Sequence, residues 1–109
     1  MKAILAVTTV CVALGSPCRA DERNTTVAAA LHENAIEDAR LFCKDHLVID
    51  EAREASALAG ATAMVRKAND PDKLMDRMNA MSVKLRKELG QKEYCAMIAR
   101  RMPTIYRVR

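Results

Sequence analysis

The stretch DPDKLMDRMNAMSVKLRKELG, residues 70–90, specifies one amphipathic helix from its first residue to its last. Asp70 is a favourable N-cap residue, and Pro71 suits the first helical turn. Gly90 fits the position just past a helix, where a left-handed residue is preferred. Five apolar side chains recur between these ends at helical spacing: Leu74, Met78, Met81, Leu85 and Leu89. We therefore predict a helix here and expect the rest of the chain to be organised around it.

The first 20 residues are predicted to be a signal peptide. Lys2 supplies a short positive start, and residues 3–14 form an apolar run without a charge. Residues 18–20, Cys-Arg-Ala, place small side chains where a cleavage site before Asp21 needs them. The alternative is an uncleaved N-terminal anchor, although the apolar run is short for a membrane span. We expect a soluble mature chain, residues 21–109, that is exported to the periplasm or secreted.

Signal cleavage would leave two of the four cysteines, Cys43 and Cys95. An even pair of cysteines in an exported chain is typical of one disulfide, and the alternative is a pair of buried free thiols. The pair encloses the predicted helix of residues 70–90. Because the enclosed loop is long, its closure is worth about 4 kcal/mol in the chain-entropy model.

Composition favours a helical fold. The sequence holds two Tyr, one Phe and no Trp, and β-sheet cores depend on aromatic and β-branched residues. Three Gly and three Pro provide few turns for a many-stranded fold. With 109 residues the chain forms one domain. We predict an all-α fold: a small bundle of three to four helices within residues 21–109, closed by the Cys43–Cys95 disulfide.

Two further helices are expected before residue 70. Thr26 is a candidate cap for a helix that runs to about Leu47 with apolar residues on two sides, which suits a helix with several neighbours. Asp50 is a candidate cap for a second helix. The alternative is one helix over residues 26–69, since neither Gly nor Pro marks a break. A stripe of small side chains predicts close packing on a neighbour: Ala52, Ala55, Ser56, Ala59 and Ala63.

A last, shorter helix is expected from Gln91 to Pro103. Its apolar side comprises Tyr94, Cys95, Ile98 and Met102. The tail that follows, residues 104–109, alternates in a strand-like way and is either flexible or covers an exposed groove.

Charge is distributed unevenly along the chain. Residues 21–72 carry six basic and eleven acidic side chains, and residues 73–109 carry ten basic and three acidic ones. Pairing between early and late helices is the favoured explanation, and a basic surface for an anionic envelope component or an acidic protein is the alternative. Five candidate partner-binding residues follow from the second explanation: Arg100, Arg101, Tyr106, Arg107 and Arg109.

Few residue patterns point to chemistry. Met75, Met78 and Met81 form M-x-x-M-x-x-M, and thioethers bind Cu(I), but core packing explains the same spacing. Many carboxylates occur without an isolated pair and are expected to be solvated helix surface: Glu33, Glu37, Asp38, Asp50, Glu51 and Glu54. No nucleophile elbow, phosphate loop or zinc spacing is present, so we expect neither an enzyme nor a cofactor. Basic residues without aromatic partners make nucleic-acid binding a poor fit.

The overall plan is a signal peptide, about 90 mature residues, helices and two distant cysteines, Cys43 and Cys95. In architecture this plan resembles the acid-stress chaperones of the bacterial periplasm, and small periplasmic immunity and inhibitor proteins share it. The resemblance assigns no residue a role. The signal segment, the absence of catalytic motifs and the uneven charge lead us to expect a non-enzymatic protein that binds another macromolecule in the bacterial envelope, as a stress chaperone or as an inhibitor or immunity protein. The alternative is a periplasmic Cu(I)-binding protein that uses Met75, Met78 and Met81.

Overall fold

A computed structural model describes the backbone of residues 16–109 and the side chains from Thr25 onward. Its elements are α2 (Ser16–Phe42), β1 (Leu47–Ile49), α3 (Glu51–Val65), α4 (Pro71–Leu89), α5 (Gln91–Arg101) and β2 (Tyr106–Val108). The predicted bundle of three to four helices is confirmed, since the described residues form four helices with one small sheet. The predicted signal peptide falls mainly on residues 1–15, which lie outside the described residues.

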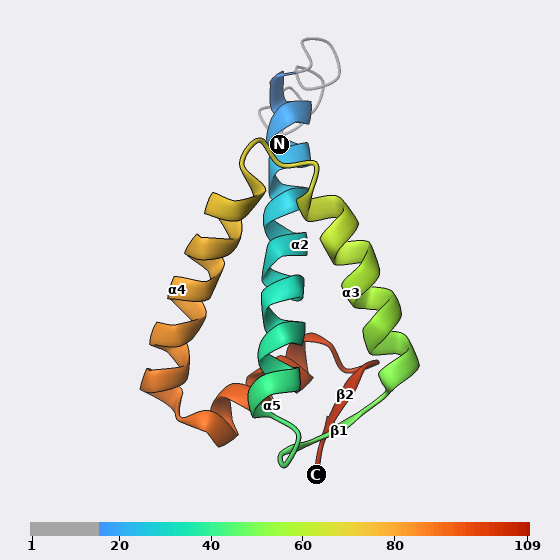
Figure 1. Cartoon of the computed structure of the whole chain (residues 1–109), viewed down its shortest axis with the longest axis vertical. Helices are drawn as coiled ribbons and strands as arrows, with labels where there is room; N and C mark the ends of the chain where they lie inside the picture. Colours follow the sequence, from blue (N-terminus) through green and yellow to red (C-terminus); the bar gives the residue numbers. More distant parts are fainter. Residues whose placement is uncertain (1–15) are drawn as a thin grey trace, which may run out of the picture.

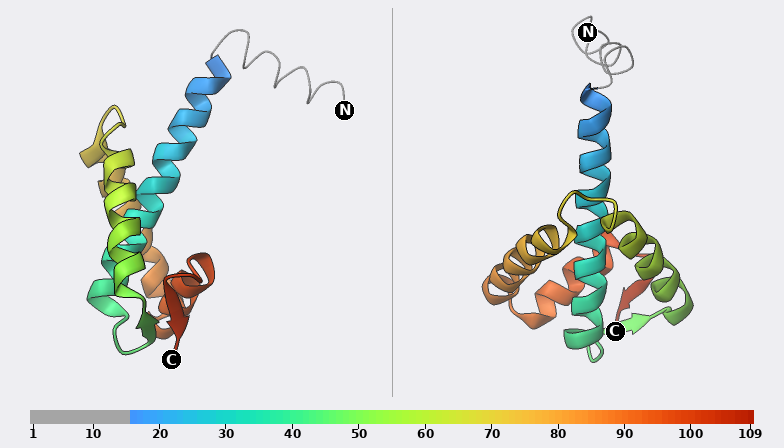
Figure 2. Two further views of the ribbon diagram at one scale, coloured as in Figure 1. Left: turned by 90° about the vertical axis from the view of Figure 1, so that its right-hand side faces the viewer. Right: turned by 45° about the horizontal axis from the view of Figure 1, so that its top comes forward.

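The central element is α2, with α3 on one side, α4 on the other and α5 crossing its foot (Figure 1). A second view shows the same order, with α3 and α4 inclined away from each other below their shared turn (Figure 2). The prediction that residues 70–90 organise the chain is therefore wrong. The physical reason is the apolar surface of α2, which is buried on several sides: Ala30, Ile36 and Ala39 are all fully buried.

The helix signals of residues 70–90 are confirmed in α4. Asp70 Oδ1 accepts a hydrogen bond from the Lys73 N–H at 3.1 Å, and Pro71 lies in the first turn. Gly90 has φ of 81°, in the left-handed region that favours glycine. The predicted stripe is only partly buried, because Met81 is 57% exposed and Leu89 is 41% exposed.

The helix ends before residue 70 differ from the prediction. α2 begins at Ser16, ahead of Thr26, and Pro17 lies in its first turn, where proline is tolerated. It ends at Phe42 rather than near Leu47, since Leu47 belongs to β1. The alternative of one long helix is wrong, and Asp50 caps α3 by accepting from the Arg53 N–H.

The sheet pairs β1 with β2 in antiparallel register, with Leu47 opposite Val108 and Ile49 opposite Tyr106. The tail of residues 104–109 is therefore neither free nor a groove cover, and its strand-like alternation is real. Leu47 and Tyr106 point inward and are fully buried, which explains why three residues suffice for each strand. The disulfide Cys43–Cys95 joins the end of α2 to α5 beside this sheet.

The core has two parts. The upper part is small and aromatic-free: Ala29, Ala30, Ala61, Val65 and Met78. The lower part surrounds the disulfide and contains both tyrosines: Ala35, Ile36, Ala39, Cys43, Leu47, Tyr94, Cys95, Ile98, Ala99, Met102, Ile105 and Tyr106. Predictions for the last helix are confirmed, because its four expected apolar residues are all buried there.

The small-residue stripe of α3 does not pack on a neighbour. All five of its residues are exposed: Ala52, Ala55, Ser56, Ala59 and Ala63. α3 instead turns Glu54, Ala61 and Val65 toward α2. Polar contacts on that face, described below, fix the rotation of the helix and override the smallness of the stripe.

Candidate functional site

A groove of about 730 Å³ lies between α2, α4 and α5. Its apolar lining comes from all three helices: Ala28, Leu31, Ala35, Met78, Met81, Leu85, Met97, Ile98 and Met102. Four of the seven methionines in the sequence therefore meet in one concave surface. Because methionine is unbranched and polarisable, it adapts to irregular apolar partners and is common at versatile binding surfaces.

Exposure varies from the floor of the groove to its rim. Met78 and Met102 are buried, at 5% and 7%, and form the floor. Met81 at 57% and Leu31 at 37% stand at the rim and are open to solvent. An apolar rim above an apolar floor is typical of a surface that a partner covers.

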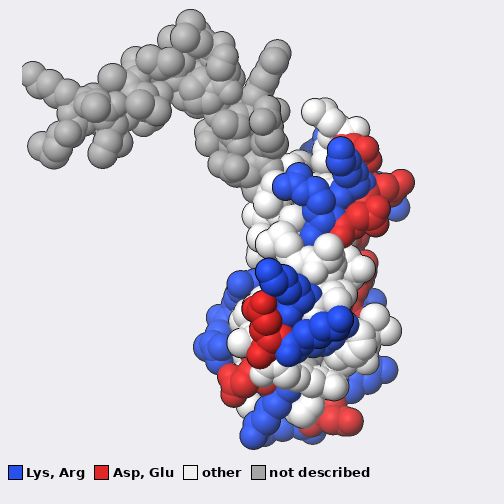
Figure 3. All heavy atoms as spheres, turned by 90° about the vertical axis from the view of Figure 1, so that its left-hand side faces the viewer, with Lys and Arg blue, Asp and Glu red and all other residues white. Residues whose placement is uncertain are grey.

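The charged side chains at the groove are mostly basic. Lys84 and Arg101 line it together with His32, and Glu88 is the acidic residue in the same lining. On the face of the molecule that α4 forms, Lys and Arg side chains surround uncharged surface, with Asp and Glu side chains among them (Figure 3). The groove thus combines an apolar interior with a predominantly cationic edge.

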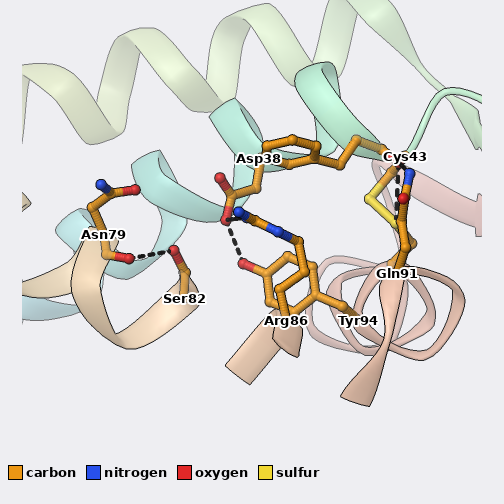
Figure 4. Close-up of polar contacts among 9 residues, drawn as sticks. Asp38, Cys43, Asn79, Ser82, Arg86, Gln91 and Tyr94 are labelled. Atoms are coloured by element: carbon orange, nitrogen blue, oxygen red, sulfur yellow. Dashed lines mark hydrogen bonds and ion pairs between the residues drawn. A yellow bond between two sulfur atoms is a disulfide. The ribbon is translucent and has the colours of Figure 1, made fainter. Parts of the chain in front are cut away.

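A buried polar contact lies behind the groove and joins three helices. The Tyr94 hydroxyl of α5 donates a hydrogen bond to the Asp38 carboxylate of α2 (Figure 4). The Arg86 Nη1 of α4 lies 3.7 Å from the same carboxylate oxygen, and its guanidinium stacks 4.0 Å from the centre of the Phe42 ring. This contact holds α4 and α5, which line the groove, against α2.

A second contact of the same kind lies at the sheet. Tyr106 Oη donates to Glu54 Oε2 at 2.6 Å, and Arg40 Nε donates to Glu54 Oε1 at 2.9 Å. Thr62 Oγ1 donates to Glu33 Oε1 at 2.7 Å, again between α3 and α2. The prediction that the carboxylates are solvated surface is therefore wrong for three of them, Glu33, Asp38 and Glu54, which are buried.

Both tyrosines are held in their neutral form. Burial raises the pKa of Tyr94, and its hydrogen bond to the Asp38 carboxylate raises it further. Burial and the Glu54 carboxylate raise the pKa of Tyr106 in the same way. The cause in each case is that an ionised phenolate would be desolvated next to a carboxylate.

We therefore expect the protein to lose stability as the pH rises above about 10, the pKa of an unfolded tyrosine. A group whose pKa is raised on folding stabilises the native state below the unfolded pKa, and this stabilisation disappears as the pH rises toward the folded pKa. Tyr94 and Tyr106 are the only tyrosines, so tyrosinate absorbance reports both. It should appear together with the loss of helical circular dichroism, and tyrosinate formation in a fully helical protein would contradict this expectation.

A second hollow, of about 660 Å³, lies beside β1. Arg40, Lys44 and Arg109 line it together with Glu51 and Glu54. Arg40 is already paired with Glu54, and Arg109 Nε donates to the Lys44 carbonyl at 3.3 Å. Because charges of both signs compensate each other here, the groove is the better candidate site.

The five predicted partner-binding residues do not form one surface. Arg101 lines the groove, whereas Arg109 lies at the second hollow. Arg100 and Arg107 are exposed, on α5 and β2. Tyr106 is 2% exposed and hydrogen-bonded inside the protein, so its role here is structural.

The predicted methionine triplet is divided between two places. Met78 and Met81 line the groove, but Met75 packs against the upper part of the core. Met97 and Met102 join this pair in the groove, which depends on the fold because only the packing of α5 brings them there. Among the described residues no group of three or more His, Cys, Asp or Glu side chains could hold a metal ion.

No family model, curated protein or solved structure matches this chain. Within the described part of the chain, none of the helices combines the length and apolar character that a membrane crossing requires. Arguments about function therefore rest on the groove and its charges.

Proposed function

We propose that this chain is a non-enzymatic protein of the bacterial envelope that binds another protein through the groove between α2, α4 and α5. The observation that carries the proposal is the cluster of Met78, Met81, Met97 and Met102 in one open concavity. Met81 and Leu31 are exposed at the rim of the same groove, and a contiguous exposed apolar patch of this kind marks a binding site. The disulfide is consistent with an exported chain.

Two kinds of protein fit this description, a stress chaperone and a small inhibitor or immunity protein. They differ in the number of partners, because a chaperone binds many clients weakly and an inhibitor binds one protein tightly. A chaperone of the acid-stress type would also expose additional apolar surface when the pH falls to about 3, which an apolar dye detects.

The test captures binding partners from the native cell envelope on three immobilised proteins. These are the wild type and the variants Met81→Asp and Leu41→Asp. Leu41 is 72% exposed and lies outside the groove lining, so its variant is the matched control. We expect Met81→Asp to weaken capture on the order of 30-fold, as for an interface hot spot, and Leu41→Asp to leave it unchanged. Equal recovery with both variants would show that the groove is not the binding surface.

Copper binding is the second candidate, with a changed set of ligands. The groove brings His32 together with Met78, Met81, Met97 and Met102, and these are soft or borderline ligands for Cu(I). Met75 does not line the groove and is therefore no longer a candidate Cu(I) ligand. Titration of the metal-free protein with Cu(I) tests this candidate, and metal binding that Met81→Leu leaves unchanged would remove it.

A further inference from the structure

We propose that the groove receives an acidic amphipathic helix of the partner protein. This inference rests on the proposed function and names the chemistry of the partner at the same site. Its basis is the juxtaposition of a methionine-lined groove with Lys84 and Arg101 at the edge.

The shape of the groove suits the apolar side of a helix. Met78, Met81 and Leu85 follow one another along α4 at intervals of three and four residues and form one wall. Met97 of α5 and Leu31 of α2 contribute to the lining from the other two helices. A concavity of about 730 Å³ is the size of pockets that take a few large side chains. An amphipathic helix supplies such side chains on one face at the same spacing.

The basic residues of α4 and α5 favour acidic residues on the polar face of the partner helix. α4 and α5 together carry eight Lys or Arg residues and four Asp or Glu residues. Arg77 precedes Met81 by one helical turn and Lys84 by two, so all three lie on the same side of α4, where Glu88 one turn after Lys84 is the acidic residue in the groove lining. A partner helix with its apolar side in the groove would place its flanking residues against these cations, which favours Asp and Glu there.

An anionic membrane is the competing partner for a basic, apolar surface. A bilayer is flat on the scale of this groove and cannot reach the floor formed by Met78 and Met102, which are 5% and 7% exposed. The concave shape therefore favours a helix over a lipid surface. Vesicles that contain anionic lipid are included in the experiment below to test for binding to a membrane surface.

The experiment measures the dissociation constants of two synthetic helical peptides by calorimetry. Both peptides carry the same leucine stripe, and their polar faces carry either Glu or Lys. We expect the Glu peptide to bind wild-type protein at least tenfold more tightly at low salt. The variant Lys84→Glu with Arg101→Glu should reverse this preference, because both exposed side chains then repel the Glu peptide.

The matched control is Lys67→Glu with Arg107→Glu, which changes the net charge equally at exposed residues outside the groove lining. It should retain the wild-type preference. Equal binding of both peptides, abolished by Met81→Asp, would overturn the acidic partner and leave the proposed function standing. Binding of anionic vesicles in place of either peptide would assign the groove to lipid. Binding of neither peptide would overturn the acidic helix, and the capture experiment with Met81→Asp decides the proposed function separately.

Discussion

Replacing Cys43 and Cys95 by serine is expected to lower the free energy of unfolding by about 4 kcal/mol. The disulfide joins residues 52 apart in the sequence, and α3 and α4 both lie within the loop that it closes. Without the bond, the unfolded chain gains the entropy of that open loop. A small domain has a free energy of unfolding of only about 5 to 15 kcal/mol, so this loss removes a large fraction of it.

The measurement is denaturant unfolding followed by circular dichroism, for oxidised wild type, chemically reduced wild type and the double serine variant. The reduced protein is the control for the serine hydroxyls, because it opens the loop without changing the side chains near α5. Agreement between reduced wild type and the variant assigns the loss to the loop. A reduced protein with the midpoint of the oxidised one would contradict the expectation.

Local signals were sufficient to predict α4. Its start depends on a cap at Asp70 and its end on the left-handed Gly90, and both effects act within one helical turn. The pairing of Cys43 with Cys95 followed from the prediction that signal cleavage removes the other two cysteines, since only one disulfide is then possible. These features required no knowledge of which helices touch.

The position of the buried carboxylates could not be predicted in this way. Asp38 and Glu54 look like ordinary helix-surface residues, because their partners Tyr94 and Tyr106 lie 56 and 52 residues further along the chain. Burial of a carboxylate is tolerable only once such donors are in place. The pairs Asp38–Tyr94 and Glu54–Tyr106 can therefore be recognised only in the folded protein, where the helices bring each carboxylate to its tyrosine.

The groove depends on the same long-range arrangement. Met78 and Met81 were recognised as a possible site, but Met97 and Met102 approach them only because α5 turns back under α2 after Gly90. The disulfide and the contact between Asp38 and Tyr94 hold α5 in that place. Packing of one short helix thus converts a helical stripe into a concave surface.

The variant Glu54→Ala is expected to lower the free energy of unfolding by about 1 to 3 kcal/mol, the cost of leaving the buried Tyr106 hydroxyl without its acceptor, since the Arg40 side chain is 44% exposed and stays solvated. The Glu54 side chain is 6% exposed, and it links α3 to Arg40 of α2 and to Tyr106 of β2. Its removal leaves the buried Tyr106 hydroxyl and the Arg40 guanidinium without their acceptor. Chemical denaturation at neutral pH provides the measurement.

Glu51→Ala is the matched control, since Glu51 lies one turn earlier on α3 and is exposed. An exposed substitution of this kind changes the free energy of unfolding by about 0.5 kcal/mol or less. Tyr106→Phe removes the other end of the contact, and its effect should not add to that of Glu54→Ala, because both variants break the same hydrogen bond. Additive losses, or a Glu54→Ala variant as stable as Glu51→Ala, would mean that this carboxylate does not hold α3 and the sheet together.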